Sequence, residues 1–327
     1  MTLRCFRQLA DVLRHGSAVL ATVVQSKGSV PREVGAKMII GADGRTFDTI
    51  GGGAGEAKVI RHAMTVLETG EKQWVELDLS GAPQRETQGI CGGTMQVWLE
   101  RWDGAGAIAL VHQILNTLRS GQPATLVTPF DTGHSPYLAD PMALPTPTHA
   151  FVETLQPAPT LLIVGAGHVG EQLAKVAHRI GFEIVIQDDR PEWANPQRYP
   201  QAAQIFVEPV AATMVQLATH TQLYAALVTR SYQYDLEALE SLLKRAVPCQ
   251  YIGMIGSEKR VCQVYQAIAK TGIPGSTLES IYAPIGLDIG ALTPEEIAVS
   301  ISAELILARR GGTGRPLSGQ WKCGYPT

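Results

Sequence analysis

The sequence predicts an α/β protein of two domains, a mixed α+β domain followed by a parallel sheet with helices on both faces. The chain has 327 residues, more than one hydrophobic core supports at roughly 100 to 200 residues per domain. A proline-rich stretch divides it. After this stretch the apolar pattern changes to regularly alternating strands and helices, which is typical of a parallel sheet.

Residues 1–130 form the first predicted domain. Its N-terminal residues are apolar at helical spacing, but charges interrupt the continuous apolar run that a signal peptide needs. Runs of β-branched and apolar residues, with an Asp-Gly turn at Asp43 and Gly44, predict strands, and a period near 3.6 predicts helices. The expected elements are strands over 17–25 and 36–53, a helix over 56–70, strands over 72–80 and 94–102, a helix over 107–121 and a strand over 124–130.

Residues 131–159 hold six prolines and no long apolar period, so we expect a linker there. The second domain is expected over 160–312 and a loose tail over 313–327. Its closing helix begins at Thr293, with Pro294 and Glu296 completing the signature of a capping box. The other expected elements are strands over 160–165, 182–188, 202–208, 223–230 and 250–256, and helices over 168–180, 235–246 and 258–272. A further helix is expected between the strands at 202–208 and 223–230.

Composition indicates a cytoplasmic globular protein. Hydrophobic residues make up 45% and charged residues 17%, and the net charge of -3 gives no general attraction to nucleic acid or to an anionic membrane. No run approaches the ~20 apolar residues of a membrane helix. The five cysteines are odd in number and show neither CxxC nor zinc spacing, which favours reduced thiols.

A glycine fingerprint opens the second domain. Gly165, Gly167 and Gly170 have GxGxxG spacing between an apolar strand and a helix, as in a dinucleotide-binding Rossmann domain. Gly165 permits the tight turn, Gly167 lets phosphate oxygens approach the backbone, and Gly170 lets the helix pack closely on the strand. Asp188 ends the next strand, where an acid accepts ribose hydroxyls and favours NAD over NADP. A Rossmann domain without a ligand remains the alternative.

A second loop with Gly256 and Ser257 opens the helix that carries Lys259 and Arg260. An anion site and an ordinary capped helix are equally consistent with it. The second half offers no obvious pair of a histidine and an acid for hydride transfer, which weighs against a dehydrogenase.

Three further glycine-bearing stretches, at 27–40, 49–60 and 89–100, each lie next to a predicted strand. Their loops are expected to gather at one sheet edge and to present backbone N–H groups to a large polar ligand. The last of them, "GICGGTMQVWLE", places Cys91 before Gly92 and Gly93. Cysteine burial is common, so a buried filler is the ordinary interpretation of this thiol.

These stretches, together with "LLIVGAGHVG", "IQDDRPEWANPQRYP", "IGMIGSEKR" and "YAPIGLDIGALTPEEIAVSISAELI", resemble the XdhC/CoxI family, the accessory proteins of molybdenum-containing xanthine dehydrogenases. The resemblance spans nearly the whole chain outside the predicted linker. It implies an N-terminal XdhC/CoxI domain, a C-terminal Rossmann domain and a homodimer. Where many members carry Thr-His, this chain has Thr229 and Arg230, a change that favours an anionic ligand.

The resemblance implies a maturation factor that binds the molybdenum cofactor, assists its sulfuration by a cysteine desulfurase and delivers it to an apo-molybdoenzyme of the xanthine dehydrogenase type. We therefore expect a non-enzymatic accessory protein with the molybdenum cofactor as cargo and NAD(P) or another nucleotide in the Rossmann site. An NAD(P)-dependent oxidoreductase with its substrate site between the domains is the alternative.

With this cargo, Cys91 becomes a candidate molybdenum ligand, because thiolates are soft donors and Gly92 and Gly93 leave room for a pterin. The other candidates that contact cofactor in the first domain are Gly52, Gly53, Glu56 and Arg32. For Glu56, helix capping is as consistent as ligand contact. For Arg32, pairing with phosphate and simple solvation both remain open, as they do for Lys37.

Overall fold

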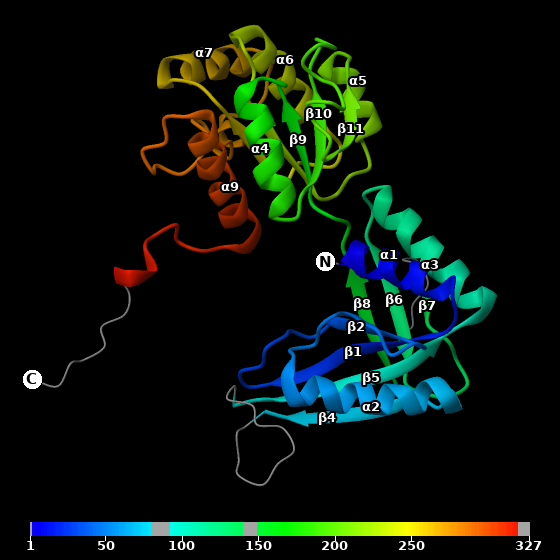
Figure 1. Cartoon of the computed structure of the whole chain (residues 1–327). Helices are drawn as coiled ribbons and strands as arrows, with labels where there is room; N and C mark the ends of the chain where they lie inside the picture. The colour runs from blue at the N-terminus through cyan, green and yellow to red at the C-terminus, as the bar shows by residue number, and fades with distance from the viewer. Residues whose placement is uncertain (1, 80–91, 140–148, 320–327) are drawn as a thin grey trace, which may run out of the picture. The chain divides into compact units, whose positions relative to one another are not determined.

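The computed structural model describes residues 2–79, 92–139 and 149–319. The chain divides into two compact units, Met1–Pro157 and Ala158–Thr327, each with its own sheet and core. The first unit is mixed α+β and the second contains a five-stranded parallel sheet, which confirms the predicted fold class (Figure 1).

The first unit is built on a five-stranded antiparallel sheet in the order β3-β2-β1-β5-β4. A separate three-stranded antiparallel sheet has the order β7-β6-β8. Its elements are α1 (Thr2–Leu13), β1 (Ala18–Lys27), β2 (Lys37–Gly41), β3 (Thr46–Asp48), α2 (Gly53–Thr69), β4 (Gln73–Asp78), β5 (Thr94–Trp102), α3 (Gly104–Arg119), β6 (Ala124–Pro129), β7 (Tyr137–Leu138) and β8 (Ala150–Leu155).

Helix α2 lies along one face of the larger sheet (Figure 1). Its buried residues Val59, Ala63 and Val66 follow the helical period and pack on alternate strand residues such as Met38 and Met95. Helices α1 and α3 pack against each other, and α1 also contacts β1, β2 and β3. Phe6 of α1 packs on Trp102, at the opposite end of the β1–β5 pair from the glycine loops that follow Lys27 and precede Thr94.

The predicted linker over 131–159 needs correction. Strands β7 and β8 lie within it, and both pair with β6, so the segment completes the first unit. The unit boundary falls between Pro157 and Ala158. Proline density misled the prediction, because Pro136 and Pro157 lie just outside the paired residues, where a missing N–H costs no ladder hydrogen bond.

The second unit is a parallel sheet in the order β11-β10-β9-β12-β13. The strand order reverses between β9 and β12, where open sheets of this kind bind ligands. Its elements are β9 (Thr160–Val164), α4 (His168–Arg179), β10 (Glu183–Gln187), β11 (Ala202–Phe206), α5 (Val210–Gln216), β12 (Leu223–Leu227), α6 (Tyr232–Leu243), β13 (Tyr251–Met254), α7 (Glu258–Ala269), α8 (Gly275–Glu279), α9 (Pro294–Arg310) and η1 (Leu317–Gly319).

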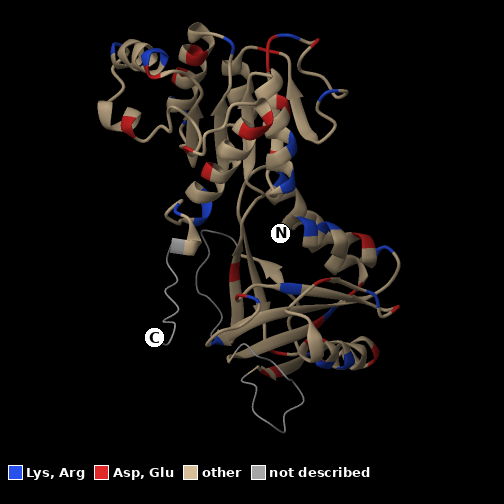
Figure 2. Cartoon of the chain, turned by 60° about the vertical axis from the view of Figure 1, so that its left-hand side comes forward, with Lys and Arg blue, Asp and Glu red and all other residues tan. Residues whose placement is uncertain are grey.

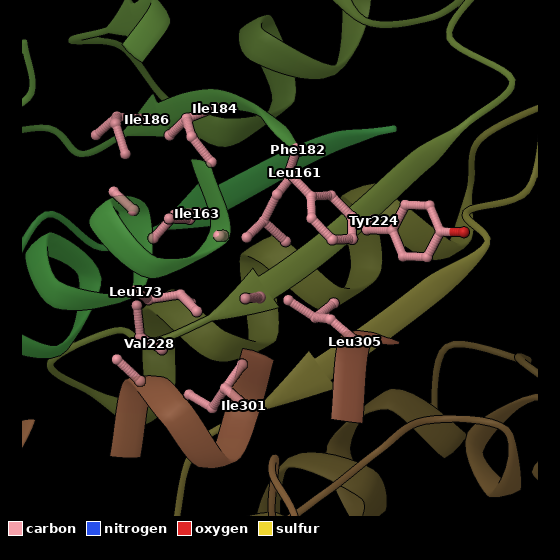
Figure 3. Close-up of a cluster of buried hydrophobic side chains, with 14 of the residues drawn as sticks. Leu161, Ile163, Leu173, Phe182, Ile184, Ile186, Tyr224, Val228, Ile301 and Leu305 are labelled. Atoms are coloured by element: carbon pink, nitrogen blue, oxygen red, sulfur yellow. The ribbon is translucent and has the colours of Figure 1, made fainter. Parts of the chain in front are cut away.

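Two hydrophobic layers cover the two faces of this sheet. Alternate residues of β9 face opposite layers: Leu161 and Ile163 pack with α4 and α9, and Leu162 and Val164 pack with α5, α6 and α7. Figure 3 shows Ile301 and Leu305 of α9 reaching the first of these layers. The expected capping box is confirmed, because Thr293 Oγ1 accepts from Glu296 N at 3.2 Å and Glu296 Oε2 accepts from Thr293 N at 3.0 Å.

Acidic and basic residues are interspersed on both units (Figure 2), as the small net charge suggests. Within the described ranges, no helix is both long enough and apolar enough to span a membrane.

Candidate functional site

The three glycine-bearing stretches of the first unit meet, as the sequence predicted. A Cβ on Gly93 would lie 2.4 Å from Ser29 O and 2.6 Å from Lys27 O, so the two backbones touch. A Cβ on Gly51 would lie 2.4 Å from Pro31 Cγ. Only glycine permits these approaches. The loop that follows β1 therefore contacts both the start of α2 and the residues before β5.

Backbone is exposed where these stretches meet. Gly51, Gly52 and Gly53 all have positive φ, at 139°, 80° and 67°, and a Cβ on Gly52 or Gly53 would meet no atom within 4 Å. Glu56 Oε2 accepts hydrogen bonds from Thr49 Oγ1 at 2.5 Å and from Gly52 N at 3.0 Å. Glu56 thus makes the contacts expected of a residue that caps the helix, and these hydrogen bonds hold the triple-glycine turn in place.

The two candidate cations of this region differ. Lys37 is buried, and its Nζ donates to Glu153 Oε1 and Oε2 at 2.5 and 2.7 Å, so it joins β2 to β8. Arg32 is half-buried, and within the described residues its guanidinium has no hydrogen bond or ion pair. It is therefore the cation of this loop that is available to an anionic ligand.

Cys91 lies outside the described residues, while Gly92 and Gly93 are described. Burial raises the pKa of Cys5 to about 12 and that of Cys249 to about 11, so neither is a thiolate near neutral pH. Among the residues that the structure describes, no group of three His, Cys, Asp or Glu side chains is placed to hold a metal ion.

The fingerprint glycines of the second unit divide into two kinds. A Cβ on Gly165 would lie 2.6 Å from Val228 O, and one on Gly170 would lie 2.3 Å from Gly165 O. Both positions therefore serve close packing between β9, β12 and α4. A Cβ on Gly167, the N-cap of α4, would meet nothing within 4 Å. Its surroundings are open, as an approaching phosphate requires.

Asp188 is more enclosed than a ribose acceptor needs to be, with only 5% of its surface exposed. Its Oδ2 accepts from Ala166 N at 2.7 Å and from Arg190 Nη2 at 2.9 Å, and its Oδ1 accepts from Arg190 N and Nε at 3.1 and 2.8 Å. A carboxylate has about four acceptor positions. A ribose hydroxyl would therefore have to displace a donor of this chain.

A crevice lies beside Asp188 at the carboxyl ends of β9, β10 and β12. It is lined by Val164, Gly165, Gln187, Asp188, Asp189, Thr229, Arg230 and Tyr234. Asp189 Oδ2 accepts from Tyr234 Oη at 2.7 Å and from Arg230 Nη2 at 3.1 Å, and Arg230 also donates to Tyr234 Oη. The hydroxyl of Tyr234 and the guanidinium of Arg230 help to lower the pKa of Asp189.

A buried hydrogen-bond network, which the sequence did not predict, holds Thr229 of this crevice in place. Asp235, with no exposed surface, accepts from Thr229 Oγ1 at 2.6 Å and from Arg260 Nε at 2.6 Å. Burial raises the pKa of Asp235, although both partners oppose that shift. Arg260, weighed above as part of an anion site, is thus engaged by a carboxylate, and Ser257 caps its helix. The sequence shows these residues but not their proximity.

Comparison with known proteins places this geometry in a family. Residues 12–78 match the model described as the XdhC and CoxI family, and residues 161–305 match the XdhC Rossmann domain. A protein of Bacillus subtilis (strain 168), described as a probable xanthine dehydrogenase subunit, is 28% identical over 338 residues, covering 93% of this chain and 98% of that protein. The molybdenum cofactor insertion chaperone PaoD of Escherichia coli (strain K12) is 24% identical, covering 89% of this chain and 83% of PaoD.

A solved structure agrees with the sequence matches. A crystal structure described as a xanthine dehydrogenase from Bacillus halodurans matches with a TM-score of 0.76 and 26% identity, covering 98% of this chain and 99% of that one. The glycine stretches at 27–40 and 49–60 lie within the first matched segment, and the fingerprint turn lies within the second. On this evidence the chain belongs to the XdhC and CoxI family.

Proposed function

We propose that this protein is an accessory factor for a xanthine dehydrogenase-type molybdoenzyme: it binds molybdenum cofactor as cargo, assists its sulfuration and inserts it into the apo-enzyme. Family membership supports the accessory role, and the insertion chaperone PaoD, a relative over most of its length, supports this cargo. In this proposal the protein works in the cytoplasm as a homodimer, and a cysteine desulfurase supplies the sulfur.

The observation that carries the proposal is the meeting of three glycine loops in the first unit, beside a cation without a described partner. Molybdenum cofactor is a phosphorylated pterin that holds its metal through sulfur. Its phosphate can accept from a backbone N–H and from a guanidinium, which Gly53 and Arg32 offer beside the Gly52 turn that Glu56 holds. Its metal end prefers a soft donor, and Cys91 next to Gly92 is the candidate.

Cargo content provides the test of this site. The protein is co-expressed with a molybdoenzyme of the xanthine dehydrogenase type, and the pterin and molybdenum that it carries on purification are measured by fluorescence and mass spectrometry. Arg32→Gln is expected to lower pterin content several-fold, because a charged hydrogen bond to phosphate is worth about 1.5 to 3 kcal/mol. Arg7→Gln changes the same charge on an exposed residue of α1 and is expected to retain wild-type content. Purified wild-type protein without pterin under these conditions would refute the proposal.

The Rossmann unit is proposed to bind a nucleotide, with the diphosphate at the open Gly167 turn and the N-terminus of α4. When bound, a nucleotide such as NAD(P) would supply either redox chemistry or a binding signal. The oxidoreductase alternative requires hydride transfer. A purified protein that oxidised NAD(P)H with a substrate in the absence of pterin would replace the chaperone proposal with that alternative.

A further inference from the structure

The crevice at the carboxyl ends of the strands of the second unit contains an arginine, Arg230, whose position indicates which chemical group a bound nucleotide would present to it. Arg230 follows β12, and its side chain is 39% exposed. One face of its guanidinium lies 4.3 Å from the centre of the Tyr234 ring. Gly165 of the fingerprint turn packs directly on the backbone of Val228 and Thr229. The cation therefore stands next to the turn where the nucleotide is proposed to bind.

The backbone that carries Arg230 is fixed. Thr229 is buried and donates to Asp235, and Arg260 donates to Thr229 Oγ1 at 3.0 Å. Arg260 also pairs with Asp235 at 2.5 Å. This network holds the start of the Arg230 side chain in place, so binding through its guanidinium requires only a change of partner.

Both acids of the crevice already accept from donors of this chain, Asp188 through both oxygens and Asp189 through Oδ2. Asp188 already accepts four hydrogen bonds, three of them from Arg190. Asp189 accepts from Tyr234 and Arg230. Arg190 stacks on Trp193 with its guanidinium carbon 5.0 Å from the ring centre. The two carboxylates of the crevice are thus already paired with oriented guanidinium groups, Asp189 with Arg230 in the crevice and Asp188 with Arg190 beside it.

We infer that the crevice takes a ribonucleotide with a phosphate on its ribose, the chemistry of NADP rather than NAD, and that Arg230 binds this phosphate by exchanging Asp189 for it. The inference rests on the nucleotide site proposed above. A phosphate monoester carries about -1.5 to -2 charges and three acceptor oxygens, so it is a stronger partner for a guanidinium than one carboxylate oxygen is. This preference reverses the expectation that Asp188 selects NAD.

The inference makes predictions of opposite sign for two exposed residues. Arg230→Gln removes the phosphate partner, whereas Asp189→Asn removes both the competing acceptor and a like charge. Both side chains are substantially exposed, so both variants are expected to fold. Lys259→Gln, on an exposed residue of α7, makes the same charge change as Arg230→Gln outside the crevice and serves as the control.

The experiment is isothermal titration calorimetry of the full chain with adenosine 2′,5′-bisphosphate, adenosine 3′,5′-bisphosphate and 5′-AMP. We expect the wild type and Lys259→Gln to bind the 2′,5′-bisphosphate roughly tenfold or more tightly than 5′-AMP, the range of one charged hydrogen bond. Arg230→Gln should bring that ratio near one and leave the affinity for 5′-AMP unchanged. Asp189→Asn should increase the ratio.

Four outcomes would overturn the inference. If the wild type binds 5′-AMP as tightly as the 2′,5′-bisphosphate, the ribose phosphate is not recognised, although the nucleotide site stands. If the 3′,5′-bisphosphate binds as tightly as its isomer, or if Arg230→Gln keeps the preference, the assignment to Arg230 is wrong. If none of the three ligands binds, the nucleotide site fails, and the inference fails with it.

Discussion

Substitution of two glycines of the fingerprint turn, three residues apart, should affect different properties: stability at Gly170 and nucleotide binding at Gly167. Gly170 contributes packing, because a Cβ there would lie 2.3 Å from Gly165 O and 3.3 Å from Ile163 Cγ2. Ordinary contact begins near 3.4 Å, so α4 and the turn would have to separate by about 1 Å. Gly167 contributes space, because a Cβ there meets nothing within 4 Å and its φ is -75°.

The magnitudes follow from these contacts. Overpacking of a tight interior costs about 1 to 3 kcal/mol, so Gly170→Ala should lower the free energy of unfolding by that amount. A domain of about 150 to 250 residues loses about 2 to 4 °C in Tm per kcal/mol, which gives a fall of about 2 to 12 °C. Gly167→Ser places a good capping residue at the N-cap of α4 and should change stability by less than about 0.5 kcal/mol. It should nevertheless weaken nucleotide binding at least tenfold, because its side chain fills the space that a phosphate needs.

Differential scanning calorimetry of the full chain measures the first effect, and titration with 5′-AMP and ADP measures the second. The reasoning fails if Gly170→Ala leaves the transition of the second unit unchanged. It also fails if Gly167→Ser binds ADP as tightly as the wild type does, because the open space beside Gly167 would then have no role in binding.

Three further outcomes follow from the first unit. Burial raises the pKa of Glu100 to about 7 despite Lys72 beside it, whereas the pKa of a glutamate in the unfolded chain is about 4.3. The protonated Glu100 carboxyl therefore contributes fully to the free energy of unfolding below about pH 4.3, and this contribution is lost as the pH rises to about 7. Urea unfolding at pH 5 and pH 8 should therefore show a smaller loss for Glu100→Gln than for the wild type, and an equal loss would contradict the argument. Gly93→Ala should destabilise the first unit by about 1 to 3 kcal/mol, because its Cβ meets two carbonyl oxygens; chemical denaturation checks this, and a neutral result would show that the loop after β1 yields easily. Cys91→Ser should fold normally yet lose both pterin content and activation of a co-expressed partner enzyme, since a hard donor replaces a soft one; retention of both would make the thiol a filler.

The fold was predictable to the extent that local patterns determine it. The apolar strands and capped helices of the second unit were predicted because adjacent strand residues face opposite hydrophobic layers and Thr293 and Glu296 complete a local motif. Strands β7 and β8 were missed because their stability comes from pairing with β6. That pairing has no signature in the proline-rich sequence around either strand. The short helix α8 shows the same limit for a segment of only five residues.

The first-unit loops were predicted to gather because each flanks a strand of one sheet, and the contacts of Gly93 and Gly51 confirm this. What the sequence did not reveal is which polar groups are already engaged. Arg32 and Lys37 look alike as isolated cations, yet Lys37 is bound by Glu153 from a strand more than a hundred residues away. Only the folded arrangement distinguishes a cation that joins two strands from one that has no described partner.

Asp188 shows why spacing alone is a poor guide to ligand chemistry in this fold. The position after the second Rossmann strand identifies the acid that faces the ribose in many nucleotide sites, and Asp188 occupies that position. Its capacity to accept is set by neighbours: Ala166 comes from the fingerprint turn, and Arg190 lies two residues further along the chain. Once these donors saturate the carboxylate, the exposed charges of the crevice are those of Asp189 and of Arg230, and the fingerprint does not include Arg230. The ligand preference of the crevice therefore depends on Arg230 at the end of β12 as well as on Asp188 at the end of β10. A ribose phosphate would bind to the first and a free ribose hydroxyl to the second, so the relative affinity of ligands with and without that phosphate is the quantity to measure.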